Sequence, residues 1–266
     1  MILTAPRLIA VGTHHKTGTL WMRAVFRRLA GMLGLSEHVV YPRTARPKVD
    51  PMRERALLMS WSSRFPAWLM ARPDARVLHV IRDPRDVLLS GMRYHRHAGE
   101  KGERFLHEPR DDLDGRTYQE HLNGLADEGA RLLFEMENKH AETLAEMLAW
   151  DYDHPATVET RYEALMADTD CRLFREHLRD LGLPEAEVDQ GVEVFWAKSL
   201  FGGLADPAVR GDRVAAHVAS GQVAQWRERL PRAVAEIYAE RHGDALVALG
   251  YEEHPTRWLE GLRHAA

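Results

Sequence analysis

The residues best suited to chemistry lie in the sequence GTHHKTGTLW, which begins at Gly12 and follows the apolar run at 8–11. A helical pattern begins at Thr19, so the segment predicts a strand, a phosphate-sized loop and a helix. The first amides of such a helix lack intrahelical partners, and the helix dipole adds partial positive charge there. The sequence therefore predicts an anion cradle, to which Lys16 adds a cation and Thr17 and Thr19 add hydroxyls.

The P-loop of nucleotide triphosphatases, GxxxxGK[ST], does not fit, because Lys16 precedes Gly18 instead of following a glycine. The order Lys-Thr-Gly-Thr-Leu-Trp at 16–21 instead resembles the 5′-phosphosulfate loop of the sulfotransferases, which reads close to Pro-Lys-Ser-Gly-Thr-Thr-Trp. Those enzymes transfer a sulfuryl group from 3′-phosphoadenosine 5′-phosphosulfate (PAPS) to an acceptor and release PAP. The resemblance implies that the co-substrate is bound by Lys16, Thr17, Gly18, Thr19, Leu20 and Trp21. It also implies that Lys16 stabilises the leaving phosphate and that Trp21 stacks on adenine.

A second motif follows the β-branched run at 77–81, which predicts another strand. Arg-Asp-Pro-Arg-Asp-Val at 82–87, followed by Ser90, is similar to the 3′-phosphate motif of the sulfotransferases, Arg-Asn-Pro-Lys-Asp-Val followed by a Ser. The resemblance implies that Arg82 and Ser90 bind the 3′-phosphate. A guanidinium gives bidentate donors to a phosphate, and a hydroxyl supplies a neutral third. Pro84 fits the first position of the helix that follows.

Shorter matches extend the resemblance to about residue 251. Arg-Tyr-Glu-Ala-Leu at 161–165 is similar to the family's Arg-Tyr-Glu-Asp-Leu, which implies that Tyr162 contacts adenine. Ser-Leu-Phe at 199–201 stands where the family has Thr-Ser-Phe, which implies that Ser199 and Phe201 pack around adenine. Gly221 matches a loop near Arg-Lys-Gly-x-x-Gly-Asp-Trp-Lys that contacts the nucleotide.

Two departures from the family stand out. The Arg-Lys pair that normally grips the 3′-phosphate is replaced by Ala219 and Ser220, and we expect Arg210 and Arg213 to substitute for it. The usual catalytic His is also absent from the sequence LLMSWSSRFP at 57–66. A hydroxyl acceptor still favours a general base, for which His14 is the leading candidate. The other candidates are His95, His97 and Glu120 beside His121.

The composition excludes several other classes of protein. The 266 residues are 45% hydrophobic and 29% charged, as in an ordinary globular chain, and a net charge of −4 argues against nucleic-acid binding by the whole surface. One cysteine, Cys171, excludes an internal disulfide and is interpreted as structural. No apolar run reaches the roughly 18 residues of a membrane span, so we expect a cytoplasmic enzyme. No Cys/His cluster has ligand spacing, so we expect no metal.

The whole pattern predicts one α/β domain over residues 1–266, with a mostly parallel sheet of about five strands flanked by helices, in the P-loop-like sulfotransferase fold. The core spans about 7–251, with mobile loops at about 42–52, 98–115 and 202–220. Two helices are expected between Tyr118 and Trp150, with a break near Asn138.

The predicted function is transfer of a sulfuryl group from PAPS to a hydroxyl or amine. The alternatives are a nucleotide kinase-like phosphoryl transferase and a catalytically silent PAP-binding or scaffold protein. A kinase is disfavoured by the position of Lys16 and by the lack of an acidic strand end for Mg²⁺. The aromatic and basic residues expected around the acceptor fit a small molecule, a lipid or a carbohydrate, and the sequence does not fix the oligomeric state.

Overall fold

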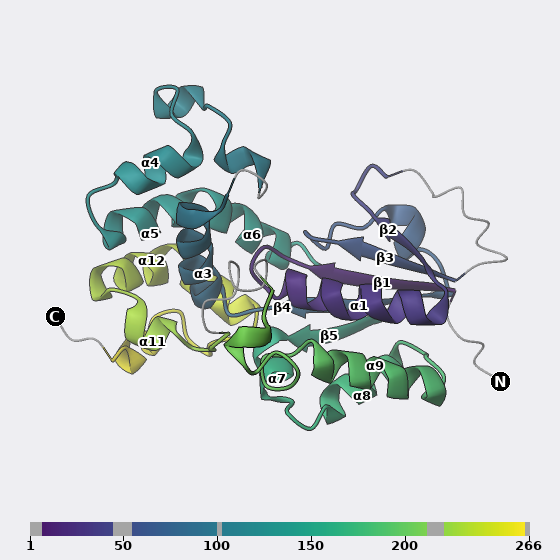
Figure 1. The fold of residues 1–266 in the computed structure, drawn as a ribbon. Helices are drawn as coiled ribbons and strands as arrows, with labels where there is room; N and C mark the ends of the chain where they lie inside the picture. The colour runs from purple at the N-terminus through teal and green to yellow at the C-terminus, as the bar shows by residue number, and fades with distance from the viewer. Residues whose placement is uncertain (1–6, 45–54, 100–102, 212–220, 264–266) are drawn as a thin grey trace. The chain divides into compact units, whose positions relative to one another are not determined.

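A computed structural model describes residues 7–44, 55–99, 103–211 and 221–263 (Figure 1). Contacts divide the chain into two compact units. The first unit, here called the sheet unit, comprises Met1–Arg82 and Ala149–Ala215. The second, here called the helical unit, comprises Asp83–Leu148 and Ala216–Ala266. The predicted single domain over 1–266, its core limits and its mobile loops stay predictions.

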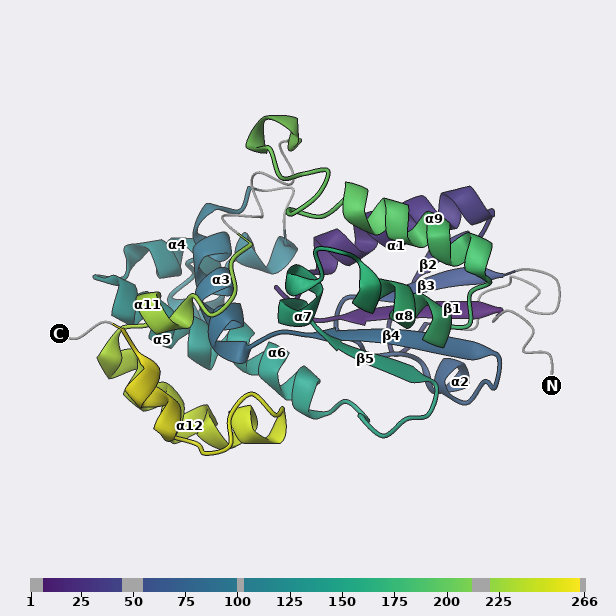
Figure 2. The same cartoon turned by 90° about the horizontal axis from the view of Figure 1, so that it is seen from below.

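The sheet unit is built on five parallel strands in the order β2-β3-β1-β4-β5. Their bounds are β1 Leu8–Thr13, β2 Ser36–Val39, β3 Ala56–Ser60, β4 Ala75–Ile81 and β5 Thr157–Arg161. Figure 2 shows β5 beside β4 at one edge of the sheet. The predicted α/β class with a parallel sheet of about five strands is confirmed.

Apolar side chains cover both faces of this sheet, as buried parallel strands require. One face carries Ile9, Val11 and Leu78 against helices that lie over it (Figure 1). The opposite face carries Leu8, Ala10 and a short helix that buries its leucine. The helices of the sheet unit are α1 Thr19–Leu33, α2 Ala67–Met70, α7 Tyr162–Ala167, α8 Arg172–Asp180 and α9 Glu185–Ala197. Cys171 is buried in the apolar core on the sheet face that carries Ile9, Val11 and Leu78, as a structural cysteine would be.

The helical unit has its own apolar core. The described residues of this unit form six α-helices, and all of them except the helix at Lys139–Leu148 contribute side chains to that core. They are α3 Pro84–His97, α4 Tyr118–Gly124, α5 Glu128–Glu137, α6 Lys139–Leu148, α11 Trp226–Arg229 and α12 Arg232–Ala248. Short 3₁₀ helices lie at Arg104–Leu106, Asp111–Leu113 and Arg257–Gly261 in this unit, and at Pro207–Val209 in the sheet unit. No helix in the described parts of the chain has the length and apolar character needed to cross a membrane.

The expected pair of helices between Tyr118 and Trp150 is wrong, because the structure has three. The predicted break at Asn138 is present, and a further break separates α4 from α5. Local capping explains it: the Asp127 side chain accepts a hydrogen bond of 2.8 Å from the amide of Ala130 and starts α5 anew. A capping box formed by Thr117 and Glu120 fixes the start of α4.

A buried arginine joins the ends of the helical unit. The Arg85 guanidinium donates to Asp83 at 2.8 Å and to Glu252 at 2.6 Å. It also lies over the ring of Trp226, with its central carbon 3.7 Å from the ring centroid, and faces Trp258 at 4.8 Å. Because this side chain is only 2% exposed, losing a partner would leave an uncompensated buried charge.

We therefore expect Arg85→Ala to lower the free energy of unfolding by about 3 kcal/mol or more, since it leaves the buried carboxylate of Asp83 and the partly exposed one of Glu252 without their cation. Chemical denaturation followed by tryptophan fluorescence measures this. Arg104→Ala is the matched control, because Arg104 pairs with Glu108 on the surface of the same unit with 91% of its side chain exposed. Equal losses for both variants would contradict the structural role of Arg85.

Candidate functional site

The predicted cradle is a tight loop between β1 and α1. Gly18 is the N-cap of α1 with φ 99°, in the left-handed region that favours glycine, and Lys16 adopts φ 63°. No side chain caps this helix end by a hydrogen bond. The first-turn amides of α1 therefore remain available to an anion, at the positive end of the helix dipole. A non-glycine residue in a left-handed conformation, such as Lys16, is typical of functional loops.

Threonine hydroxyls hold the loop in shape. The buried Thr17 hydroxyl donates to the carbonyls of His14 and Val80, at 3.1 and 3.2 Å, and accepts from the His14 amide at 2.8 Å. The Thr19 hydroxyl donates to the same His14 carbonyl at 2.9 Å and shares a hydrogen bond with Thr13. These hydroxyls, predicted as ligands of the anion, are bound within the loop, and Thr17 has no exposed surface.

Two predicted nucleotide ligands lie beside this loop. Arg82, at the end of β4, donates from Nη1 to the carbonyl of Lys16 at 3.2 Å. Its guanidinium also lies over the ring of Tyr162, 4.5 Å from the centroid. A Cβ placed on Gly18 would lie 3.0 Å from the same ring, so the tyrosine packs directly against the loop. Residues from three distant parts of the sequence thus meet at the start of α1.

The predicted adenine contacts form one aromatic cluster. Trp21 meets Tyr162 and Phe201 edge to face, with centroids 6.2 and 6.1 Å apart. Trp21 also stacks on Phe195, with centroids 4.9 Å apart and planes 21° apart. Aromatic rings in such a cluster offer apolar faces and edges to a purine. Phe195 was not predicted, because nothing in the local sequence separates it from the other apolar residues of α9.

The remaining predicted ligands are Leu20, Ser90, Ser199 and Gly221. Ser199 is fully buried and donates to the carbonyl of Trp196 at 2.9 Å, so its hydroxyl serves the turn after α9. Leu20 is half-buried in the first turn of α1. Ser90 is half-buried on α3, and Gly221 has φ 66°; both belong to the helical unit.

The predicted substitutes for the missing Arg-Lys pair are only partly described. Arg210 donates to the carbonyls of Leu204 and Ala205, at 2.8 and 3.1 Å, which folds it onto its own loop. Arg213, Ala219 and Ser220 lie outside the described residues.

His14, the leading candidate base, is the end of a buried chain of polar side chains. Its Nε2 lies 2.9 Å from Nε2 of His79, on β4. Nδ1 of His79 lies 2.6 Å from Oε2 of Glu159, on β5. The other oxygen of Glu159 accepts a hydrogen bond from Nε1 of Trp150 at 2.6 Å. Neither His79 nor Glu159 was predicted, since a single polar residue in a strand gives no sign of a partner on another strand.

Burial determines the charges of His79 and Glu159. It lowers the pKa of His79 to about 3, because an imidazolium there would be poorly solvated. It raises the pKa of Glu159 to about 7, although the hydrogen bond from Trp150 lowers it in part. His79 is therefore neutral at physiological pH, while Glu159 changes its charge near neutrality.

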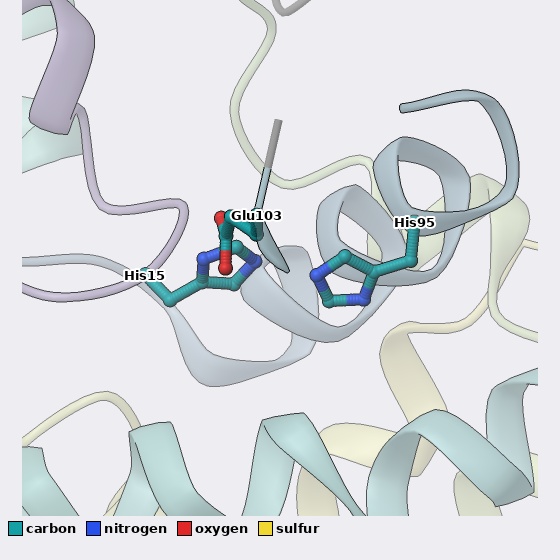
Figure 3. Close-up of side chains that lie close together, drawn as sticks. All are labelled: His15, His95 and Glu103. Carbon is teal, nitrogen blue, oxygen red and sulfur yellow. The ribbon is translucent and has the colours of Figure 1, made fainter. Parts of the chain in front are cut away.

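His95, a second candidate base, lies in a similar setting in the helical unit. Its Nδ1 is 2.7 Å from Oε2 of Glu135, which also accepts a hydrogen bond of 2.8 Å from the hydroxyl of Tyr118. His95 projects from α3, and a carboxylate oxygen of Glu103 lies within 4.8 Å of a nitrogen of its ring (Figure 3). A buried carboxylate can orient an imidazole, so the chemistry of this pair fits a base.

The other candidate bases have structural contacts. Glu120 closes the capping box of α4 by accepting from the Thr117 amide at 2.9 Å, which lowers the pKa of its carboxyl. Burial lowers the pKa of His121, which packs on the ring of Phe134. His97 is exposed at the end of α3.

Of the comparisons with known proteins, the one with solved structures bears on the fold. A scan against known protein families finds no match, and no curated protein matches the chain. Solved structures do match. Mouse sulfotransferase SULT7A1, complexed with PAP, is 14% identical over 97% of this chain and 90% of its own, with a TM-score of 0.60. Retinol dehydratase in a complex with retinol and PAP is 12% identical over 91% and 82%, with a TM-score of 0.54.

Retinol dehydratase in complex with androsterone and inactive cofactor PAP is 13% identical over 91% of this chain and 81% of its own, with a TM-score of 0.51. The fold of this chain is therefore the sulfotransferase fold, and the fold predicted from the two motifs is confirmed. At these identities the likeness concerns the fold alone.

The left-handed Gly18 gives a direct test of the cradle. We expect Gly18→Ala to weaken PAP binding at least tenfold, because the new methyl strains the backbone and presses on the Tyr162 ring. Isothermal titration calorimetry measures the affinity. Gly31→Ala, in the same helix with nothing within 4 Å of the added carbon, is the control and should bind as wild type does. Equal affinities for both variants would exclude the helix start as the binding site.

The raised pKa of Glu159 predicts a pH-dependent stability. Because the folded state holds the proton of this carboxyl up to about pH 7, while an unfolded Glu releases it near 4.5, the stability that Glu159 contributes is lost as pH rises through that window. Glu159→Gln does not ionise, so its unfolding free energy relative to wild type should rise by about 2 kcal/mol between pH 5 and pH 8. Urea unfolding at both pH values measures the difference. Glu193→Gln, exposed on α9, should show no such trend, and a flat result for Glu159→Gln would contradict the assignment.

Proposed function

We propose that this protein is a sulfotransferase that uses PAPS and releases PAP. The observation that carries the proposal is the meeting of Arg82, Tyr162 and Gly18 at a helix start without a side-chain cap. Lys16 in the first motif and Arg82 in the second contact each other in space, although they are 66 residues apart in the sequence. Both motifs were chosen from a resemblance in sequence. The sulfotransferase fold gives independent support.

The sheet unit has groups suited to each part of PAP. The amides at the start of α1, with Lys16, suit the 5′-phosphate, because they combine hydrogen-bond donors with positive charge. The aromatic cluster around Trp21 suits adenine. Arg82 suits the 3′-phosphate, and the resemblance in sequence assigns Ser90 and Gly221 to binding of the same nucleotide. Leu20, Ser199 and Phe201 complete the proposed binding set.

The proposed reaction is an in-line displacement at sulfur. The acceptor oxygen forms a bond to sulfur while the bond from sulfur to the bridging phosphate oxygen breaks, and the electron pair stays on that oxygen of PAP. Lys16 stabilises this growing negative charge, and the helix dipole of α1 adds to the effect. His14 accepts the proton that the acceptor releases.

We propose that the acceptor is a small molecule, a lipid or a carbohydrate that carries a hydroxyl or an amine. We also propose that the protein uses no metal, binds no nucleic acid and is located in the cytoplasm. A kinase-like phosphoryl transferase and a silent PAP-binding protein remain the alternatives. Two titrations separate the first alternative: we expect PAP to bind at least 100-fold more tightly than ATP with Mg²⁺.

Transfer of labelled sulfate tests the activity itself. Wild-type protein with ³⁵S-labelled PAPS should label a member of a panel containing 2-naphthol, a long-chain alcohol, a sterol and a hexosamine. We expect Lys16→Ala to lower turnover by about 10³-fold or more, as expected for loss of charge stabilisation, and to leave PAP affinity within tenfold. Lys198→Ala, half-buried after α9, is the control for loss of a lysine.

A comparison of two histidine variants tests which residue is the general base. His14→Ala should abolish turnover and spare PAP binding, whereas His95→Ala should retain turnover. The reverse order would assign the base to the His95–Glu135 pair. Binding of PAP without transfer to any member of the panel would favour the silent binder.

A further inference from the structure

A row of side chains crosses the sheet unit from His14 in the loop after β1, through His79 on β4, to Glu159 on β5. The register of the parallel strands pairs Gly12 with His79, and His79 with Glu159. Paired positions point to the same face of a sheet, so His79 and Glu159 stand side by side. The loop after β1 then brings His14 back onto His79, with ring centroids 5.1 Å apart.

Aromatic rings pack against the hydrogen-bonded chain of side chains that runs from His14 to Glu159. Trp150 stacks on the ring of His79, with centroids 4.2 Å apart and planes 23° apart, and Tyr152 meets it edge to face at 5.7 Å. His14 and His79 are fully buried, while 30% of the Glu159 side chain is exposed. This hydrogen-bonded chain therefore runs from the loop that carries Lys16 to a half-buried glutamate, 30% of whose side chain is exposed.

The hydrogen bonds of this chain determine where each proton lies. An ionised Glu159 only accepts, so Nδ1 of His79 carries the hydrogen. Neutral His79 then has its lone pair on Nε2, so Nε2 of His14 must donate to it. The lone pair of a neutral His14 is then on Nδ1. A carboxylate 80 residues from His79 in the sequence thus makes a base of one particular nitrogen of His14.

We propose that Glu159 and His79 are positioning residues that set the tautomer of His14 and conduct its proton to solvent during sulfuryl transfer. This inference rests on the proposed function. As the acceptor O–H bond breaks and the O–S bond forms, Nδ1 of His14 takes the proton. Nε2 of His14 gives its hydrogen to Nε2 of His79, Nδ1 of His79 gives its hydrogen to Glu159, and the carboxyl releases one proton to water, which leaves both rings in the reversed tautomers. The starting tautomers return when, after product release, Glu159 takes up a proton from water, each ring passes a hydrogen back and Nδ1 of His14 loses its proton to water. The net charge of the relay is therefore unchanged over one cycle.

The same geometry predicts that protonation of Glu159 reverses the relay. A protonated carboxyl donates to Nδ1 of His79, so both imidazoles change tautomer and Nδ1 of His14 becomes a donor. The raised pKa of Glu159 puts this reversal near pH 7. Among the described residues, Arg76 on β4 and His177 and Asp180 on α8 line a pocket together with Glu159. Tyr152, in the segment before β5, interacts electrostatically with both Glu159 and Arg161.

Glu159→Gln tests the relay sharply, because Trp150 fixes the orientation of the new amide. The Trp150 N–H needs an acceptor, so the glutamine oxygen faces it and the NH₂ group faces His79. The amide then donates to Nδ1 of His79 and forces the reversed tautomers. In the double variant with Trp150→Phe the amide is free to turn, and its oxygen can again accept from His79.

Nitrogen-15 NMR of the histidine rings reads the tautomers without any need for activity. At pH 8, wild type should show hydrogen on Nδ1 of His79 and on Nε2 of His14. Glu159→Gln should show the opposite at both rings, and the double variant with Trp150→Phe should return toward wild type. His177→Gln, which removes a buried histidine that bonds Thr160 on the same strand, should leave both rings unchanged. Hydrogen on Nδ1 of His14 in wild type, or no change in Glu159→Gln, would overturn the proposal.

Kinetics with ³⁵S-labelled PAPS and 2-naphthol supplies the second readout. Turnover of wild type should fall below about pH 7, while Glu159→Gln should be at least tenfold slower at pH 8, independent of pH in this range, and within twofold of wild type in PAP affinity. Turnover of Glu159→Gln equal to wild type, with the reversed tautomers present, would overturn the catalytic role of the relay. Absence of transfer by wild type with the expected tautomers would contradict the proposed function, and with it the catalytic role, while the tautomer assignment would stand.

Discussion

The left-handed conformation of Gly18 is the constraint on which the sheet unit depends. It turns the chain from the loop after β1 into α1, and because glycine has no side chain it leaves the helix start without a cap. It also lets Tyr162 approach the loop so closely that a methyl group would already be in tight contact. Arg82 then lies on Tyr162, and Tyr162 meets Trp21. One backbone conformation thus permits an uncapped helix start and an aromatic cluster to form side by side.

The motif at 82–87 serves two structural purposes. Its first arginine, Arg82, ends β4 and contacts the cradle. The following Asp83, Arg85 and Asp86 belong to the helical unit: Arg85 is held by two carboxylates between two tryptophans, and Asp86 accepts a hydrogen bond of 3.1 Å from the amide of Trp226. A sequence motif of this kind therefore combines a proposed ligand with the residues that fix the start of the next helix, which explains why its charged residues are buried.

The sequence was sufficient for most of the strands and for the loop between β1 and α1, because these depend on neighbouring residues. The apolar runs before Gly12 and Arg82 and the proline at the start of α3 act locally, and the structure has each boundary near its predicted place. The helix break before Asp127 was not predicted, because the helical pattern of the sequence continues across it and only the Asp127 cap interrupts the helix. The partners of His14 were missed for a different reason: His79 and Glu159 become neighbours only through strand register. Likewise, the sequence places hydroxyls at Thr17 and Ser199, but it does not determine whether each hydroxyl binds a ligand or the backbone.

We propose that PAP binds at the start of α1 with its adenine against Trp21. A crystal structure of the protein with PAP tests it most directly. We predict the 5′-phosphate within hydrogen-bond distance of the first amides of α1 and of Lys16, the 3′-phosphate on Arg82, and adenine in contact with the Trp21 cluster. PAP bound elsewhere, or with its 5′-phosphate away from these amides, would contradict the account.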